Sequence, residues 1–440
     1  MYLTSIEIEN VRGFLDGEAT TSIDLPAQGA GWHVFAGRNG SGKSTFLRAV
    51  ALAIVGPEHS RHLVPSFAGW IRKGSSHASV RVKIKRAPDD AYQGMGKLPK
   101  DAVSAALRWE TESTPTRASA GGAEPRLTST PQRLTKLKGP WRGPWADNPA
   151  GWLVAGYGPF RRLTGHGPDA LRVMVGPDHQ RRLVSLFRED ASLLEAAGWL
   201  QELQFRRLEE RPGAEKLLSD VLALLNDGLL PDGSTVDRVD SDGLWVKRGA
   251  SVLELRDLSD GYRVALALVI DIIRHMVGAF GSLRVERTVG SRFYVDMPAV
   301  VLIDEADAHL HVSWQQRIGF WLAERFPKVQ FLVTTHSPFT CQAATAGGLY
   351  TLAGPGEKRG AQPVDEGTFK KVVNGTANDA VLSKLFGLDR ARSERAEEMT
   401  REWSSLRANL ARRSLSAKEK ERMRVLENQL PLPFESTAAE

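Results

Sequence analysis

The stretch GRNGSGKS, residues 37–44, decides the fold. It matches the pattern G-x-x-x-x-G-K-[ST] at all four fixed positions. It lies between an apolar run at 32–36, typical of a strand, and an apolar segment at 44–55, typical of a buried helix. Glycines let successive backbone N–H groups turn inward around an anion, and the helix adds the positive end of its dipole. This order predicts a phosphate-binding loop.

The residue types within this loop assign roles. Lys43 can reach the β- and γ-phosphates of a nucleotide, and the Ser44 hydroxyl can bind Mg²⁺. The expected cofactors are therefore ATP and Mg²⁺. The expected ATP-binding residues are Gly37, Arg38, Asn39, Gly40, Ser41, Gly42, Lys43, Ser44 and Thr45.

A second apolar strand ends in two acids. Residues 299–303 are apolar and are followed by Asp304 and Glu305. Ligands of open α/β sheets collect at the carboxyl edge of the strands, so Asp304 is expected beside the glycine loop, where it binds Mg²⁺ together with Ser44. Glu305 can orient and deprotonate the attacking water.

Two further motifs narrow the class. Residues 258–263, LSDGYR, introduce a helix whose first N–H groups lack intrahelical partners and can bind an anion. A helix is expected at 313–325, followed by a second dense apolar strand at 330–334. His336 comes directly after that strand, a position that favours a catalytic role over a structural one. The candidate anion contacts in the first motif are Ser259, Asp260 and Gly261.

Together these motifs resemble the head of an ABC-type ATPase, with Walker A at 37–44, the signature at 258–263, Walker B at 300–304 and His336 as the switch histidine. The stretches SIEIENVRGF, IDEADAHLH and QFLVTTHSPF are similar to the RecF/SMC/OLD-like branch. Within that branch the chain is similar to the AAA-family ATPases of bacterial anti-phage defence, such as the ATPase subunit of Septu systems. The resemblance covers roughly residues 1–352.

The resemblance implies an α/β P-loop NTPase head that hydrolyses ATP to ADP and phosphate. In such heads the signature of one chain faces the nucleotide held by another. It therefore implies a twofold homodimer, or a higher even oligomer, in which Ser259 and Gly261 complete the partner's site. Glu305 would activate water, and His336 would contact the γ-phosphate. Hydrolysis would remove the contact between the subunits, so that ATP acts as a switch.

Three features depart from the family pattern. Residues 156–162, where a glutamine loop is usual, contain no glutamine, so the way in which the helical lobe senses nucleotide is open. Arg161 and Arg162 in this stretch could reach phosphate or lie in water. Asp260 stands where many relatives have glycine, and Ala306 replaces a frequent proline; both changes are compatible with hydrolysis.

Hydrophobic periodicity predicts four regions. Residues 1–164 form the first part of the ATPase core with an antiparallel β subdomain, and they include a basic insertion at 113–146. Residues 165–260 form a helical lobe whose hairpin leads to the signature. Residues 261–356 complete the core, and residues 357–440 form a helical extension.

Composition excludes several classes of protein. The 440 residues are 42% hydrophobic and 25% charged, which is typical of globular chains and not of disordered or fibrous ones. The most apolar stretch, VALALVIDII, contains Asp271 and is too short to span a membrane. The one cysteine, Cys341, excludes an internal disulfide and a cysteine-based zinc site. With no visible secretory signal, a cytoplasmic protein without membrane contact is expected.

Positive charge gathers in the insertion. The net charge is +6, and between residues 114 and 143 six lysines and arginines accompany one acid. With Trp141 and Trp145 nearby, this segment could contact nucleic acid through phosphates and bases. A solvated insertion without a ligand is the equal alternative.

What such a switch controls has three candidate answers. A defence ATPase would scaffold or restrain a separate effector, such as a nuclease, docked on the charged helices at 389–424; alternatively these helices form a cap packed on the head. A RecF-like ATPase of DNA repair or chromosome maintenance would act directly on DNA. The nucleotide-binding subunit of a membrane transporter is disfavoured by the sequence HLH after Asp307 and by the missing glutamine.

Overall fold

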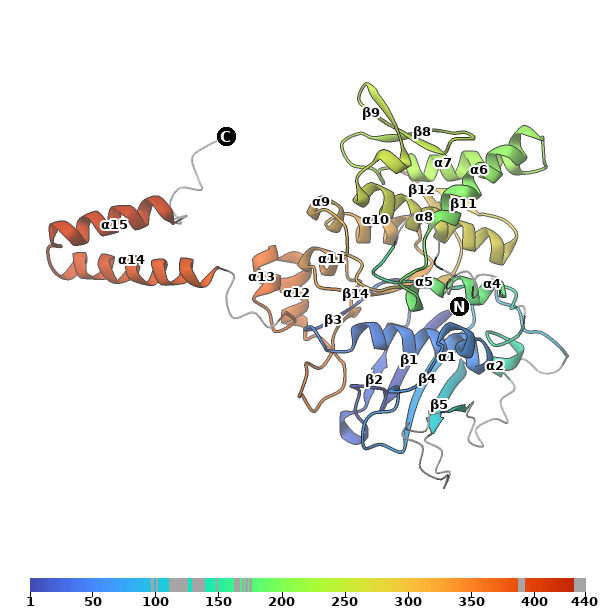
Figure 1. Cartoon of the computed structure of the whole chain (residues 1–440), viewed down its shortest axis with the longest axis horizontal. Helices are drawn as coiled ribbons and strands as arrows, with labels where there is room; N and C mark the ends of the chain where they lie inside the picture. Colours follow the sequence, from blue (N-terminus) through green and yellow to red (C-terminus); the bar gives the residue numbers. More distant parts are fainter. Residues whose placement is uncertain are drawn as a thin grey trace.

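A six-stranded sheet carries the predicted functional residues in the computed structural model of the chain (Figure 1). Every neighbouring pair of strands is parallel except β15 and β16. The order across the sheet is β16 (Gln362–Pro363), β15 (Leu349–Thr351), β3 (Gly31–Ala36), β14 (Val329–Thr335), β13 (Ala299–Ile303) and β7 (Val154–Tyr157). The structure describes residues 1–95, 99, 102–110, 126–128, 139–147, 149–161, 167, 170, 173, 176–386 and 392–430.

A second, antiparallel sheet packs against helix α1 (Lys43–Leu63). Along β4 and β5, buried residues alternate with more exposed ones, as expected for strands with one face on a core. The predicted antiparallel β subdomain is confirmed. The strand order is β2 (Thr21–Asp24), β1 (Tyr2–Glu9), β4 (His77–Lys85), β5 (Val103–Glu110) and β6 (Arg126–Thr128).

The six-stranded sheet has an apolar core on each face. Val301 and Ile303 of β13 pack toward the helical lobe, whereas Val300 and Leu302 pack toward α1 and the antiparallel sheet. Burying a side chain of this size contributes about 1.5–3 kcal/mol, and a shift of one residue would exchange the two faces. Burial on both faces therefore fixes the strand register and the position of the residues that follow each strand.

The helical lobe lies on the side of the six-stranded sheet opposite α1, drawn green to yellow in Figure 1. It leads through a short 3₁₀ turn, η2 (Leu255–Asp257), into helix α8 (Asp260–Phe280), whose buried residues join the lobe to the sheet. The other elements of the lobe are α6 (Leu194–Leu208), α7 (Ala214–Asn226), β8 (Thr235–Val239), β9 (Leu244–Arg248) and β10 (Ser251–Glu254). The short helices α4 (Asp178–Arg181) and α5 (Val184–Phe187) lie against α1.

The helix predicted at 313–325 is two helices. Arg317 N–H donates to the Trp314 carbonyl at 3.0 Å, a tight three-residue turn that separates α9 (Val312–Gln315) from α10 (Ile318–Arg325). The remaining elements are η1 (Gly17–Ala19), α2 (Gly139–Arg142), β11 (Val285–Arg287), β12 (Phe293–Val295), α11 (Pro338–Gln342), α12 (Glu366–Asn374) and α13 (Ala377–Val381).

Helix α1 continues past its predicted end because a tryptophan repairs a kink. Gly56 has a left-handed φ of 84°, and Pro57 has no N–H to donate to the Ala53 carbonyl four residues earlier. The Trp145 indole N–H donates to that carbonyl at 2.9 Å. A Cβ at Gly56 would lie 2.6 Å from Trp145 Cγ, so only glycine fits.

This packing corrects one expectation about the basic insertion at 113–146. Trp145 is buried and serves the core, so it offers no surface to nucleic acid. Trp141 is 40% exposed. Most of the insertion lies outside the described residues, which include only 126–128 and 139–146 of it. Nucleic-acid contact by the insertion stays a prediction.

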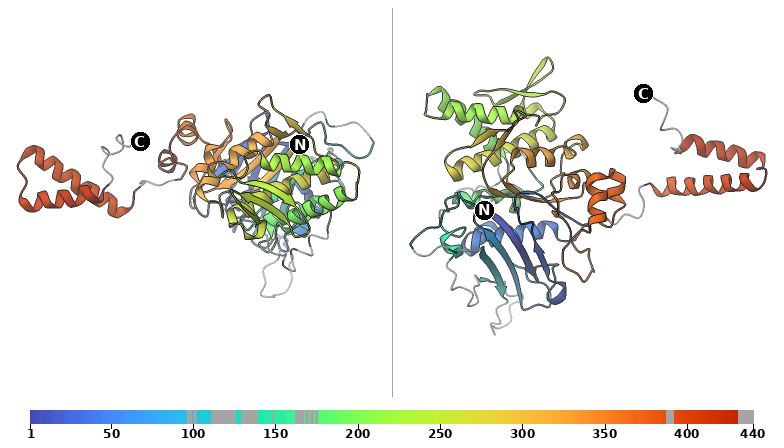
Figure 2. Two further views of the ribbon diagram at one scale, coloured as in Figure 1. Left: turned by 90° about the horizontal axis from the view of Figure 1, so that it is seen from above. Right: turned by 180° about the vertical axis from the view of Figure 1, so that it is seen from behind.

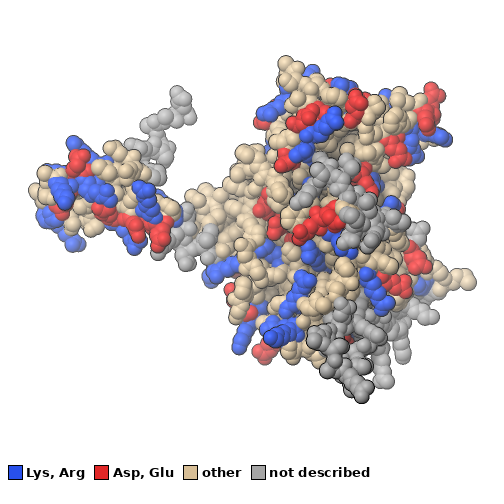
Figure 3. Space-filling model, in the orientation of Figure 1, with Lys and Arg blue, Asp and Glu red and all other residues tan. Residues whose placement is uncertain are grey.

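Two charged helices stand apart from the ATPase body. Figures 1 and 2 show α14 (Glu394–Arg412) and α15 (Ala417–Gln429) as an antiparallel pair beyond α12 and α13, not as a cap on the head. The Arg422 guanidinium donates to both carboxylate oxygens of Glu402, at 2.8 and 2.6 Å, and holds the pair together. Both signs of charge are mixed on its surface (Figure 3). The division into four regions stays a prediction.

No helix in the described part of the chain has the length and apolar character that crossing a membrane requires.

A buried histidine makes folding depend on pH. His179 on α4 contacts His59 on α1 edge to face, with ring centroids 3.9 Å apart. Burial, and then the charges of His59 and Arg182, lower the pKa of His179 to about 3. The unfolded chain, with a histidine pKa near ~6.5, therefore binds the proton more readily than the folded chain. This contribution to stability is complete above the unfolded-state pKa and is lost as pH falls toward 3.

We expect the His179 contribution to the free energy of unfolding to fall by about 2 kcal/mol between pH 7 and pH 5. Urea unfolding of a His179→Phe variant, which keeps a ring against His59, should show a pH dependence weaker by that amount. His62→Gln, a change at an exposed histidine, should leave the dependence unaltered. Equal pH dependence in wild type and His179→Phe would contradict this assignment.

Candidate active site

The residues that directly follow three neighbouring strands, β3, β14 and β13, lie at one edge of the sheet. In the parallel register, Ala36 of β3 pairs with Thr335 of β14, and Val333 of β14 pairs with Ile303 of β13. The glycine loop, His336 and Asp304 therefore follow adjacent strands at the same carboxyl edge. The structure thus brings together the predicted ATP-binding, metal-binding and catalytic residues.

The glycine loop is closed by its own lysine. Gly40 and Gly42 have left-handed φ values of 79° and 85°, which let the loop turn sharply into α1. Lys43 Nζ donates to the carbonyls of Gly37, at 2.9 Å, and Arg38, at 3.2 Å. The ammonium is thus held across the loop, where phosphate oxygens can exchange with these carbonyls.

Lys43 is surrounded by acids. Burial lowers the pKa of Lys43, and the carboxylates of Glu305, Asp304 and Asp307 act in the opposite direction. These three carboxylates, which follow β13, act on the charge of the Lys43 ammonium. A buried cation with acids around it can take up further negative charge from a nucleotide if a metal ion screens the acids.

Asp304 has one oxygen held and one available. Its Oδ1 accepts a hydrogen bond from Thr334 Oγ1 at 2.6 Å, and its backbone N–H donates to the Tyr157 carbonyl at 2.8 Å. Oδ2 is buried and has no hydrogen-bond partner among the described residues. A buried carboxylate oxygen without a donor fits a hard cation, so Asp304 and the Ser44 hydroxyl suit Mg²⁺, bound directly or through water.

Glu305 lies in a strained turn. Its φ is 47°, a left-handed value that costs about 1–2 kcal/mol for a residue other than glycine. Thr334 Oγ1 accepts the Glu305 N–H at 2.8 Å, and the Glu305 carbonyl accepts the Ala308 N–H at 2.8 Å. These bonds fix the backbone from which the candidate catalytic carboxylate extends.

Arg161 takes neither of the two roles left open by the sequence. Its side chain is 2% exposed. It donates to backbone carbonyls of the turn after β13, which are those of Asp304, Glu305, Ala306 and Ala308, and to that of Gly158. Burial lowers the pKa of Arg161 to about 10, against the opposing charges of Asp307, Asp304 and Glu305. Arg162 lies outside the described residues.

Arg161 therefore braces the turn that follows β13. This role could not be predicted from the sequence, because a lone arginine after a strand has no periodic or motif signature. The brace depends on which carbonyls the turn leaves unpaired, and only the folded backbone shows that.

Asp307 is a site residue that was not assigned a role from the sequence. Its Oδ1 accepts hydrogen bonds from the Thr335 hydroxyl and, at 3.2 Å, from the His336 N–H. Burial and then the charge of Lys43 lower the pKa of His336, against the opposing charges of Asp307, Glu305 and Asp304. The position three residues after Asp304, in the acid-rich stretch DEAD, was the available signal.

The signature residues lie at the start of α8. Ser259 and Asp260 are exposed at the start of α8, and Asp260 pairs with Arg263. A Cβ on buried Gly261 would lie 3.6 Å from Trp314 Cδ1 and 3.7 Å from the His309 carbonyl. In the described part of the chain, the contacts recorded for these residues stay within the lobe and the loop after β13. A cavity of about 590 Å³ opens beside Asp260, Arg263, His309 and Arg161.

A buried hydrogen-bond network joins the signature helix to β7, the strand next to β13. Tyr157 on β7 donates its hydroxyl to Asp271 Oδ2 on α8 at 3.0 Å. Arg274 Nε donates to Asp271 Oδ1 at 2.9 Å, and His275 Nε2 lies 3.0 Å from Oδ2. Burial would raise the pKa of Asp271, but His275 and Arg274 outweigh it and hold that pKa well below its ordinary value. Asp271 is thus a charged link between the two parts.

Two family models match parts of the chain. Residues 5–113 match a family described as "AAA domain", and residues 177–341 match one described as "AAA domain, putative AbiEii toxin, Type IV TA system". The first match contains the glycine loop. The second contains the signature, Asp304 and His336.

Relatives among curated proteins include two Septu proteins and a retron protein. Septu protein PtuA of Bacillus mycoides (strain KBAB4) is 24% identical over 388 residues, 88% of this chain and 45% of the relative. Septu protein PtuA of Bacillus thuringiensis is 25% identical over 181 residues, 40% of this chain and 42% of the relative. Retron Ec83 probable ATPase of Escherichia coli is 36% identical over 145 residues, 32% of this chain and 23% of the relative.

The chain spans less than half of the length of each of these curated relatives. The matches nevertheless confirm the predicted similarity to the ATPase subunit of Septu systems.

Solved structures of SMC heads are among the matches. The SMC head domain from Thermotoga maritima is 15% identical with a TM-score of 0.42, covering 83% of this chain and all of that one. An Smc head with an extended coiled coil, bound to the C-terminal domain of ScpA from Pyrococcus furiosus, is 13% identical with a TM-score of 0.46, covering 85% and 98%. These scores are too low to carry an argument about this chain.

We predict that Arg161→Met lowers the turnover number for ATP at least tenfold, a loss of about 1.4 kcal/mol in transition-state stabilisation, with little change in KM. The carbonyls that Arg161 holds would lose their donor, and Glu305 would lose its position. Steady-state phosphate release measures both parameters.

Arg81→Met, at a half-exposed arginine on β4, is the matched control and should keep wild-type turnover. If Arg161→Met unfolds the chain, the nearly isosteric Thr334→Val tests the same turn. A folded variant of either kind with unaltered turnover would show that the turn needs no such support.

Proposed function

We propose that this chain, an ABC-type P-loop ATPase related to Septu and retron proteins, acts as an ATP-driven switch between two copies of itself. Two chains would bind ATP between the glycine loop of one and the signature of the other. Hydrolysis to ADP and phosphate would separate them. A partner effector would respond to the difference between the ATP-bound dimer and the separated chains.

One observation supports this proposal: the predicted ATP-binding and catalytic residues share one sheet edge, and the signature residues lie elsewhere, at the start of α8. Lys43, Asp304, Glu305 and His336 follow strands at one sheet edge. Ser259, with helical N–H groups free to bind an anion, is exposed at the start of α8 without a contact to that edge among the described residues. A second chain related by a twofold axis supplies the missing half to both sites at once.

The chemistry follows from groups within this site. Bound Mg²⁺ would neutralise charge on the β- and γ-phosphate oxygens. Lys43 would add a second positive charge there, and Ser259 and Gly261 of the other chain would donate hydrogen bonds to the γ-phosphate. Glu305 would accept a proton from the attacking water, and His336 would hold the γ-phosphate from the neighbouring strand.

We further propose that a separate effector, of the nuclease class expected from the family resemblance, docks on α14 and α15. This pair stands clear of the ATPase body in Figures 1 and 2, and α14 contains no buried residue. Exposed Leu410 and mixed charges give it a surface suited to a protein partner. Location in the cytoplasm stays a prediction.

A Glu305→Gln variant should form a dimer that depends on ATP. It keeps the groups that bind nucleotide but removes the carboxylate that accepts the proton, so the closed state accumulates. Sedimentation velocity with MgATP should show a species of twice the mass, and without nucleotide the monomer. A variant that stays monomeric with saturating ATP would exclude the proposed closure.

Complementation between two inactive variants should show that the site is shared. Lys43→Ala destroys the glycine loop and Ser259→Arg destroys the signature, so each variant alone should be inactive. In an equal mixture, half of the dimers are mixed and each mixed dimer has one intact site, which gives about a quarter of wild-type activity. If the signature acted within its own chain, the mixture would be as inactive as the separate variants.

A further inference from the structure

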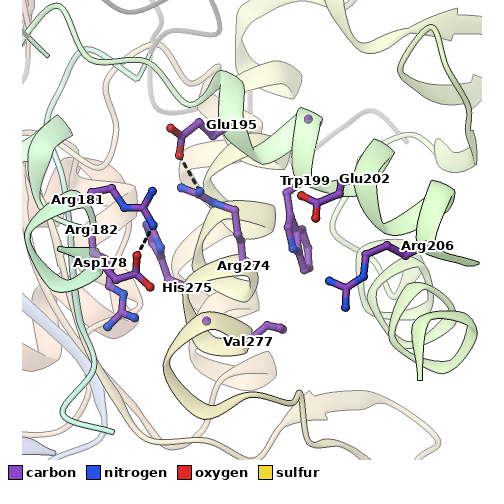
Figure 4. A pocket seen from close by; sticks show the side chains of 12 residues that line it. Asp178, Arg181, Arg182, Glu195, Trp199, Glu202, Arg206, Arg274, His275 and Val277 are labelled. Carbon is purple, nitrogen blue, oxygen red and sulfur yellow. Dashed lines mark hydrogen bonds and ion pairs between the residues drawn. The ribbon is translucent and has the colours of Figure 1, made fainter. Parts of the chain in front are cut away.

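A second polar cavity lies in the helical lobe, apart from the glycine loop. It has a volume of about 560 Å³, within the range of small-molecule sites. Figure 4 shows α4 on one side, α6 on the other and α8 between them. The charged residues that line it are Asp178, Arg181, Arg182, Glu195, Glu202, Arg206 and Arg274.

Arg182 is the residue that defines this cavity. Its side chain is 6% exposed, and within the described part of the chain its guanidinium has neither a hydrogen bond nor an ion pair. Burial lowers the pKa of Arg182 to about 10, so the group keeps its charge at neutral pH. A buried charge without a partner costs several kcal/mol in effective desolvation, so the site is built for an anion from outside.

Most of the other arginines have acids of their own. Arg181 pairs with Asp178, and Arg274 pairs with Glu195 at 2.7 Å and with Asp271 at 2.8 Å. These pairs neutralise the acids of two walls. Within the described residues Arg182 lies near Asp178 but forms no hydrogen bond or ion pair of its own.

Helix α6 contributes a positive charge and an aromatic ring to the cavity. Arg206 and Trp199 extend from α6 into the cavity in Figure 4, with Glu202 between them in sequence. Arg206 is exposed and makes no ion pair within 4.0 Å in the described residues. Guanidinium groups bind phosphate oxygens in pairs, and an indole face can stack on a planar ring.

We infer that this cavity binds a small phosphate-bearing anion, with Arg182 and Arg206 as its ligands. The shared chemistry is a phosphate or pyrophosphate group, which either a free polyphosphate or a nucleotide could supply. A nucleotide would place its base against Trp199. The site is separate from the proposed ATP site, since none of its residues belongs to the glycine loop, the signature or the Walker B turn.

The test uses the full chain with Lys43→Ala, which disables the glycine loop. Isothermal titration with pyrophosphate at low salt should show saturable binding of one ion per chain. Arg182→Gln should weaken this binding more than tenfold, and Arg206→Gln several-fold. Arg211→Gln, beyond the end of α6 at an exposed arginine that pairs with Glu209, is the control and should leave binding unchanged.

A second arm titrates AMP into the same protein. Tighter binding of AMP than of pyrophosphate, lost in Trp199→Leu, would identify a nucleotide; equal or weaker binding, indifferent to Trp199, would identify free polyphosphate. Absence of pyrophosphate binding to Lys43→Ala would overturn the inference. So would equal binding by Arg206→Gln, a surface change that leaves folding intact even if Arg182→Gln does not fold.

Discussion

The site depends on the parallel alignment of β3, β14 and β13. Because β14 pairs with both other strands, Thr334 lies where its hydroxyl can donate to Asp304 and accept from the Glu305 N–H. One side chain of the central strand thus orients both acids of its neighbour. The strand itself is buried on both faces, so it cannot slip without exposing its apolar residues. Packing of the core is therefore what sets the geometry of the candidate catalytic groups.

Arg161 adds a second constraint of a different kind. The two terminal nitrogens of the Arg161 guanidinium donate to four carbonyls of the turn after β13. The turn needs such support because Glu305 has a left-handed φ. A neutral glutamine side chain could not meet as many carbonyls. A buried cation thus ties β7 to the turn after β13.

The strand and motif order could be predicted from sequence because each signal was local. The glycine loop, the apolar runs at 299–303 and 330–334, and the acids after the first run each occupy a few consecutive residues. Hydrogen bonds between residues far apart in the chain could not be predicted from the same sequence. The Trp145 indole serves the carbonyl that Pro57 leaves free, although 88 residues separate them, and no composition rule distinguishes it from a surface aromatic. Asp271, within an apolar helix, likewise shows its partner Tyr157 only when folded.

Helix α8 is a rigid element that connects the signature residues with the polar cavity of the helical lobe. Its 21 residues span about 30 Å, with Ser259 at the first end and Arg274 near the other. Asp271 fixes the middle of this helix to Tyr157, whose carbonyl also holds the Asp304 N–H. An anion bound by Arg182 and Arg206 would share the cavity with the Arg274 guanidinium, which pairs with Asp271 and Glu195. Any resulting tilt of α8 moves Ser259 as well, because a helix packed on both sides shifts as one body and does not bend within a single turn.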